Sequence, residues 1–169
     1  QKHYLSIVSD ETKRLSRLVT AMLNMSKIEA GELKLNPKAF DISAEIFNVL
    51  LSFEQIIERK HIEISGLDRL HSVTVTADED MIHQVIYNLV DNAVKFTENG
   101  TISVFADDDE NATLIKVVNT GAGISSEERE KIFERFYKVD KSRSYDVKGA
   151  GLGLYICKTI VEMHGGSIG

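Results

Sequence analysis

The first part of the chain has a helical rhythm of apolar positions. Val8, Leu15 and Met22 are spaced by sevens within residues 4–30, and this spacing turns one face of a helix towards other helices. A single helix cannot bury such a stripe by itself, so the pattern predicts one long helix that needs a partner outside this chain. A helix lying on the core of its own domain would show the same stripe. Gly31 is the expected end of the helix.

From residue 38 onward, alternating and helical patterns interleave. Ser43 is expected to cap one helix and Asp78 a second, while Ser125 and Glu128 have the spacing of a capping box at the start of a third, shorter helix. Strands interleaved with helices favour an α/β or α+β fold, with helices layered on a mixed sheet. The expected elements are a strand at 38–42, a helix from 43, strands at 61–65 and 72–77, a helix from 79, a hairpin of strands at 101–106 and 113–118, the shorter helix at 125–137, a final helix that stops at Gly165 and Gly166, and the start of a strand at 167–169.

Charge and cysteine content narrow the class of protein. The 169 residues carry a formal net charge of −6 at pH 7, which argues against a general attraction to nucleic acid or to an anionic membrane surface. Cys157 is the single cysteine, so no intramolecular disulfide and no cysteine metal cluster can form. Its place inside the last helix predicts a small buried residue. No apolar run approaches the ~18 residues of a membrane span.

A glycine-rich segment indicates a phosphate site. Gly149, Gly151 and Gly153 come immediately before the final helix, where bare backbone N–H groups and the positive end of a helix dipole attract anions. The spacing matches neither the dinucleotide-binding fingerprint nor the P-loop. By themselves, the glycines are equally compatible with a plain turn that leads into a helix.

Polar residues on the helix from 79 add a second candidate feature. Asn88 and Asn92 are four residues apart and Lys95 is seven from the first, so all three project from one helical face. Amide oxygens and an ammonium group suit a magnesium ion that takes its other ligands from phosphate. A helix that turns polar residues to solvent would show the same pattern.

Four motifs follow one another in a recognisable order. They are “HQVIYNLVDNAVKFT” at 83–97, “NTGAGI” at 119–124, “IFERFYKVD” at 132–140 and “GAGLGL” at 149–154. Together they resemble the ATP-binding catalytic domain of bacterial sensor histidine kinases, in the superfamily that includes gyrase and heat-shock chaperone ATPases. The resemblance implies a Bergerat-type two-layer α/β sandwich, with a mixed sheet covered on one face by helices and one long helix before it.

The resemblance also implies a division of the chain. Residues 1–31 would be the second helix of a dimerisation hairpin, because “RLVTAMLNMSKIEAGELKL” at 17–35 is similar to that helix. Residues 38–169 would be the ATP-binding domain, which in the family continues into further strands, so we expect it to be truncated. The implied partners are the histidine-bearing hairpin, a response regulator and a second copy of the full-length protein, with no nucleic acid. The domain would be cytoplasmic and its parent protein would lie in the cell membrane.

Roles carry over to the residues that match the family's motifs. Asn92 would ligate Mg²⁺, Asn88 would lie beside it, and Lys95 would contact the phosphates of ATP. Asn88 and Lys95 are the two residues expected to act in catalysis. Phe96 would pack on the adenine and Asn119 would recognise its amino group. The remaining nucleotide contacts implied by the resemblance are Gly121, Gly123, Ile124, Tyr137, Lys138, Gly149, Gly151, Leu152, Gly153 and Leu154, with residues 138–148 as a lid.

Two departures from the family pattern qualify these roles. Asn119 stands where the family usually has Asp, and a neutral acceptor predicts roughly fivefold to tenfold weaker binding. We also expect looser base choice, since an Asn amide can turn and donate to guanine. The motif that carries the phosphorylated histidine is absent, and His3 does not replace it. The chain is therefore predicted to bind ATP without labelling itself.

Three functions remain open at this point. The leading hypothesis is a histidine kinase domain that positions Mg-ATP for transfer of its γ-phosphoryl group. An ATP hydrolase or clamp of the same superfamily is the first alternative, but such members place Glu where Asn88 stands, and Asn cannot act as a general base. The second alternative is a non-catalytic interaction module with weakened nucleotide binding, for which Asn119 is the only support.

Overall fold

The computed structural model describes residues 12, 19, 23, 26, 27, 34–109, 112–139 and 151–169. The chain forms two compact units, Gln1–Lys34 and Leu35–Gly169. In the first unit the isolated described residues from 12 to 27 are helical, whereas the heptad positions Val8, Leu15 and Met22 lie outside the described residues. The second unit contains every element named below.

The second unit contains two small sheets. β1 (Lys38–Asp41) pairs antiparallel with β3 (Thr74–Ala77). β2 (Glu63–Ser65) runs parallel to β4 (Thr101–Asp108), which is antiparallel to β5 (Thr113–Asn119). The larger sheet therefore has the order β2-β4-β5 and mixed direction. The expected hairpin and the mixed sheet are both confirmed.

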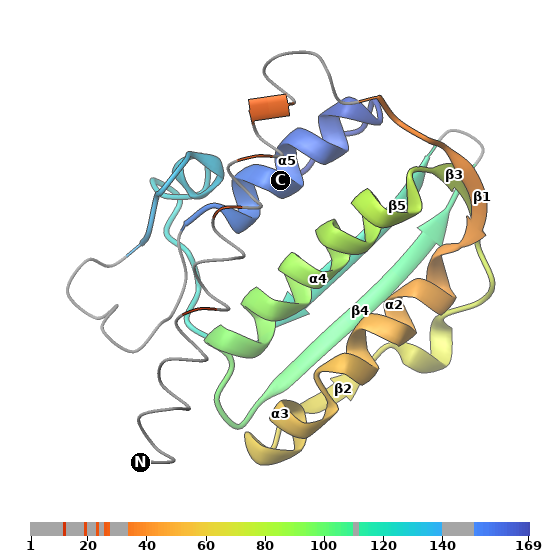
Figure 1. Ribbon diagram of the computed structural model, residues 1–169. Helices are drawn as coiled ribbons and strands as arrows, with labels where there is room; N and C mark the ends of the chain where they lie inside the picture. The colour runs from red at the N-terminus through yellow and green to blue at the C-terminus, as the bar shows by residue number, and fades with distance from the viewer. Residues whose placement is uncertain are drawn as a thin grey trace. The chain divides into compact units, whose positions relative to one another are not determined.

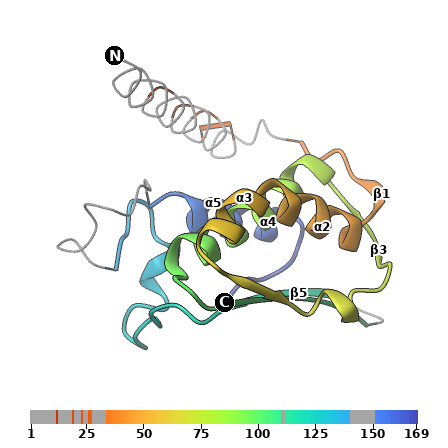
Figure 2. The same ribbon diagram turned by 90° about the horizontal axis from the view of Figure 1, so that it is seen from below.

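Helices cover one face of this mixed sheet. α4 (Glu79–Phe96) lies between α2 (Ile42–Ser52) and α5 (Gly153–Met163), and it contacts both. The short α3 (Glu54–Arg59) continues from α2. Figure 2 shows the helices on one side of the unit and β5 on the other. Two further 3-10 turns, η1 (Leu67–Arg69) and η2 (Lys131–Phe133), complete the elements.

The hydrophobic core lies between α4 and the sheet. Ile86 and Val90 on α4 and Ile102 and Val104 on β4 are all 0% exposed and belong to one buried cluster. Full burial of an aliphatic side chain of this size is worth about 1.5–3 kcal/mol. The apolar side of α4 packs against this core. Its polar residues therefore lie on the other sides of the helix, as the helical spacing predicts.

The structure corrects two expectations about the ends of elements. Asp41, not Ser43, caps α2: its Oδ1 accepts from the backbone N–H groups of Ser43 and Ala44. The Ser43 hydroxyl instead donates to the carbonyl oxygen of His71. The carboxylate two residues earlier offers the stronger acceptor to the free N–H groups of the helix. In addition, residues 167–169, expected to begin a strand, are not in a strand.

The expected helix at 125–137 is also wrong. The chain there forms turns followed by the single 3-10 turn of η2. The Ser125 hydroxyl donates to the Glu128 carboxylate at 3.1 Å, and the Glu128 N–H donates to the Ser125 carbonyl oxygen and not to the hydroxyl, so the capping box does not form. Phe136 has a φ of 62° and its N–H donates to the carbonyl oxygen of Gly151 at 2.9 Å. The Phe136 N–H thus bonds to a distant segment and not to a carbonyl oxygen one turn earlier, as it would in a continuing helix.

Candidate functional site

α4 carries the central residues of the candidate site, and both of its ends are fixed by side chains. At its start, Asp78 accepts from the N–H groups of Met81 and Asn36, and the N–H of Asp78 donates to Nε2 of His164 at 3.1 Å. At its end, the Lys60 ammonium donates to the carbonyl oxygens of residues 94, 95 and 97 at 2.9, 3.3 and 3.2 Å. Caps at both ends hold the polar face of α4 in place.

Asn88 joins α4 to the second glycine segment. Its Nδ2 donates to the carbonyl oxygen of Gly153, the first residue of α5, at 3.4 Å. Beneath it Cys157 is fully buried and donates weakly to the Val85 carbonyl oxygen. Burial raises the pKa of the Cys157 thiol to about 12, while Asn88 acts in the opposite direction. The expectation of a buried, structural cysteine is confirmed.

One turn further along α4, two polar residues are available for ligands. Asn92 is half-buried, and within the described parts of the chain its side-chain amide has no hydrogen-bond partner. Lys95 forms an ion pair with Asp91 four residues earlier on the same helix. Asn92 thus offers a free amide oxygen, and the Lys95 ammonium is held beside it at the same helix face.

The first glycine segment packs closely against the end of α4. A Cβ on Gly121 would lie 1.9 Å from the carbonyl oxygen of Phe96, far inside any allowed contact. Gly123 differs, because a Cβ there would meet no atom of the described residues within 4 Å. The Phe96 side chain is 49% exposed. The Phe96 side chain and the backbone of Gly123 are thus both exposed.

Asn119, the last residue of β5, reaches the residue that follows α4. Its Nδ2 donates to Oγ1 of Thr97 at 3.1 Å. Thr97 is 1% exposed, so its hydroxyl is shielded from solvent. Sequence reasoning did not assign Thr97 a role, although its position directly after Phe96 at the end of the first motif was a usable signal.

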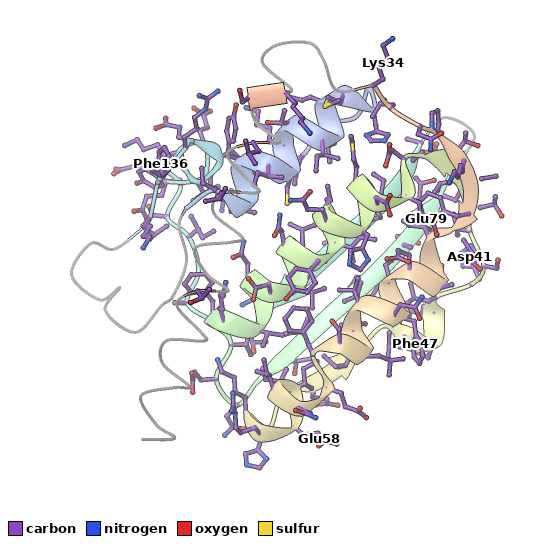
Figure 3. All side chains as sticks on the ribbon, in the orientation of Figure 1. Lys34, Asp41, Phe47, Glu58, Glu79 and Phe136 are labelled. Atoms are coloured by element: carbon purple, nitrogen blue, oxygen red, sulfur yellow. The ribbon has the colours of Figure 1, made fainter. Side chains whose placement is uncertain are left out.

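The third and fourth motifs meet each other. Gly151 has a φ of +71°, and a Cβ on it would lie 2.7 Å from the backbone carbon of Phe136 and the carbonyl oxygen of Tyr137. The Arg135 guanidinium lies 4.7 Å from the centroid of the Tyr155 ring and donates to its hydroxyl at 2.6 Å. In Figure 3, Phe136 lies beside α5, at the opposite end of the helix layer from Glu79. These contacts hold Tyr137 and Gly151, the residues that flank positions 138–150, against each other.

The other predicted site residues have varied environments. Tyr137 donates to a Glu128 carboxylate oxygen at 3.4 Å, and desolvation together with that carboxylate raises the pKa of the phenol. Leu152 is buried at 4% exposure and belongs to the interior, whereas Leu154 is half-buried. Ile124 and Lys138 are exposed. Gly149 and most of the expected lid, residues 140–148, lie outside the described residues.

The structure thus joins all four motifs through contacts along α4 and at the start of α5. Asn88 contacts Gly153, Phe96 contacts Gly121, and Tyr137 contacts Gly151. An amide face, bare glycine backbone and an exposed aromatic ring in one place suit a ligand with both a flat base and phosphate groups. Lys60 binds carbonyl oxygens at the end of α4, and Asp91 pairs with Lys95. Sequence reasoning assigned a role to neither residue.

Comparison with known proteins agrees with this geometry. Residues 77–169 match the family model of histidine kinase-, DNA gyrase B- and HSP90-like ATPases, and the chain belongs to this family. The sensor protein SrrB of Staphylococcus aureus is 40% identical over 99% of this chain and 29% of its own length. The solved structure of full-length ShkA in complex with AMPPNP superposes with a TM-score of 0.78 at 28% identity, covering 98% of this chain and 34% of ShkA.

A further solved structure is the histidine kinase ThkA in complex with the response regulator protein TrrA. It superposes with a TM-score of 0.68 at 31% identity, over 92% of this chain and 43% of that one. The relatives are sensor histidine kinases, and the part of them that this chain matches includes their ATP-binding domain. The chain spans less than a third of the length of SrrB. Among the described helices, none has the length and apolar character that crossing a membrane requires.

Proposed function

We propose that this chain binds ATP with Mg²⁺ at the end of α4 and positions the γ-phosphoryl group for transfer to a histidine on a dimerisation hairpin. The contact of α4 with both glycine segments carries the proposal. Asn88 is bonded to Gly153, and Phe96 touches Gly121. One helix therefore presents its amides and its ammonium group between two stretches of bare backbone.

The base and the phosphates would lie at opposite sides of this site. The exposed ring of Phe96, the open space at Gly123 and the side chain of Asn119 suit a purine. The N–H groups at the start of α5, which begins at Gly153, suit phosphate oxygens. The similarity to ShkA, whose structure contains AMPPNP, supports the same class of ligand.

Asn92 fits the role of a magnesium ligand. Its amide is half-buried and, among the described residues, has no hydrogen-bond partner, so its oxygen is available. Magnesium keeps most of its waters and accepts few protein ligands when phosphate supplies the others. When bound, the ion would neutralise charge on the phosphates; Lys95 would add a second positive charge from the same helix face.

Transfer is favoured over hydrolysis by the residue at position 88. An amide cannot accept the proton of an attacking water, so Asn88 supplies no general base. Its bond to Gly153 makes it a link between α4 and α5 instead. Phosphoryl transfer depends mainly on position and charge neutralisation, which this arrangement can supply if the acceptor comes from another part of the protein.

The proposed partners follow from the relatives. Residues 1–31 would be the second helix of the hairpin, and the phosphoacceptor histidine would lie in the preceding helix of the full-length protein. ThkA is solved in complex with a response regulator, so a response regulator is the proposed recipient of the phosphoryl group. A homodimer, and a membrane-bound parent with this domain in the cytoplasm, complete the proposal, supported by the description of SrrB as a sensor protein.

Two measurements test the proposal. Calorimetry should show Mg-dependent binding of ATP by this chain, and Lys95→Met should weaken binding by about tenfold or more through loss of a charged phosphate contact. Lys158→Met is the matched control, because Lys158 is an exposed lysine on α5 paired only loosely with Glu162. Absence of ATP binding at millimolar concentration would favour the non-catalytic module.

The second measurement concerns the reaction. The chain is mixed with a separately produced hairpin that bears the histidine, Mg-ATP is added, and acid-labile phosphate is measured on the hairpin. Phosphate on the hairpin supports the kinase. Release of inorganic phosphate without labelled hairpin would favour the ATP hydrolase or clamp instead.

A further inference from the structure

Asn119 and Thr97 form an isolated hydrogen-bonded pair behind the surface on which a base would lie. Asn119 Nδ2 donates to Thr97 Oγ1 at 3.1 Å. In the described part of the chain, Oδ1 of Asn119 has no partner. The Thr97 hydroxyl likewise has no acceptor for its own proton there, although the residue is 1% exposed. Each member of the pair therefore retains one unused hydrogen-bonding group.

The direction of the hydrogen bond between these two side chains can be reversed without losing the bond. A hydroxyl both donates and accepts, and an amide presents an oxygen on one side and an NH₂ group on the other. If the Asn119 amide turns by half a rotation, the Thr97 hydroxyl donates to Oδ1 in place of accepting from Nδ2. The turned state also uses the hydroxyl proton, which a buried group otherwise leaves unsatisfied. The turned orientation therefore gains at most one hydrogen bond, about 0.5–1.5 kcal/mol, and the protein permits both.

The two orientations present opposite groups to a base. With Nδ2 on Thr97, Oδ1 faces outward as an acceptor, which matches the amino group of adenine. With Oδ1 on Thr97, the NH₂ group faces outward as a donor, which matches the O6 carbonyl of guanine. A Cβ on Gly123 would meet no described atom within 4 Å, so this position does not select against either purine. A carboxylate at 119 would offer only acceptors, so it would match the amino group of adenine and not the O6 carbonyl of guanine.

We infer that the Asn119–Thr97 pair makes this nucleotide site accept guanine as well as adenine triphosphates. The inference rests on the proposed function, because it assumes that a nucleoside triphosphate binds beside Asn119. Thr97 acts as a positioning residue: it holds the amide in either orientation and need not touch the base.

The test compares Mg-ATP, Mg-GTP and Mg-CTP by calorimetry on the complete chain. We expect the dissociation constants for ATP and GTP to agree within about tenfold, a difference of one hydrogen bond or less. Asn119→Asp should retain ATP and weaken GTP by at least about tenfold, because a carboxylate faces O6 without a donor. CTP should bind more weakly than either purine.

Thr97→Val tests the positioning role while keeping the volume of the side chain. Since the hydroxyl serves both orientations, its loss should weaken ATP and GTP by similar factors and leave their ratio within about threefold. A thermal melt of each variant confirms that it is folded. Loss of ATP binding alone would mean that Thr97 holds the amide for adenine, which contradicts the inference.

The remaining outcomes separate this inference from the proposed function. ATP binding without GTP binding overturns the inference and leaves the proposed function intact. Failure of both nucleotides to bind removes the proposed function as well. GTP binding that persists in Asn119→Asp, or CTP binding equal to GTP, would show that the triphosphate alone is recognised and would overturn the inference.

Discussion

The carbonyl oxygen of Phe96 lies 1.9 Å from the point that a Cβ atom on residue 121 would occupy. The first glycine segment therefore passes the end of α4 at a distance that only glycine permits. Gly121→Ala must displace either this segment or the end of α4, and overpacking of this kind costs about 1–3 kcal/mol. We predict a lower free energy of unfolding in urea and strongly weakened ATP binding.

Gly123→Ala is the matched control for this prediction. In the part of the chain that the structure describes, a Cβ at residue 123 meets nothing within 4 Å, so the free energy of unfolding should change by less than about 0.5 kcal/mol. The two substitutions are chemically identical and lie two residues apart. Equal destabilisation by both would show that the segment needs glycine for a reason other than contact with Phe96.

Lys60 should matter for stability in spite of being a lysine near the surface. Its ammonium donates to three carbonyl oxygens at the end of α4 and pairs with Glu98 at 3.2 Å. Lys60→Met leaves these carbonyls without their donor and should lower the free energy of unfolding by about 2 kcal/mol. Lys158→Met, which loses only an exposed ion pair of 3.9 Å, should cost less than about 0.5 kcal/mol. Urea titration of both variants measures the difference.

Alanine substitutions at Gly151 and Gly165 distinguish the cost of backbone strain from the cost of steric contact. Both have positive φ, at 71° and 77°. A Cβ on Gly165 meets nothing within 4 Å, but one on Gly151 lies 2.7 Å from Phe136 and Tyr137 backbone atoms. Gly165→Ala should cost about 1–2 kcal/mol from strain alone, and Gly151→Ala about 1–3 kcal/mol more. Similar melting temperatures for the two variants would contradict the observed packing.

From the buried thiol of Cys157 we predict a specific pH dependence of the free energy of unfolding. Burial raises the pKa of this thiol from 9.0 to about 12, so the folded state retains a proton that the unfolded state loses. Stability should therefore fall as the pH rises from 9 towards 12, by up to about 1.4 kcal/mol per pH unit. Cys157→Ala should lack this component, and the difference between the two urea titrations isolates it from other groups.

The same burial protects Cys157 from reagents. At pH 8 the folded protein should react with a thiol reagent only as fast as it opens, and at full rate in urea. Rapid labelling under native conditions would mean that α4 and α5 separate readily. Such a result would also weaken the assigned contact of Asn88 with Gly153.

Several elements were predictable because their causes are local. The 18 positions after Asp78 alternate apolar and polar faces with helical period, and α4 begins at Glu79 as expected. The strand expected at 101–106 is likewise present within β4, where Ile102, Val104 and Ala106 are the buried residues. In these segments, propensity, capping and burial all favour the same structure.

The errors occurred where a distant segment competes with a local preference. Ser125 and Glu128 have the spacing of a helix start, but Phe136 is bonded to Gly151, fifteen residues later in the chain. Ser43 does not cap α2 for the same reason, because its hydroxyl donates to the carbonyl oxygen of His71. Spacing along a chain cannot reveal which remote carbonyl or N–H group will lie within reach.

The sequence by itself determined which residue types were available to this site: amides and a lysine on one helical face, and glycines where backbone must be bare. Only the tertiary structure decided that Thr97 stands behind Asn119, that Lys60 closes the end of α4, and that Gly121 touches Phe96. Helical and strand periodicity arise from neighbours within a few residues. These contacts join residues 22 to 37 positions apart, and they form only when the core brings their elements together.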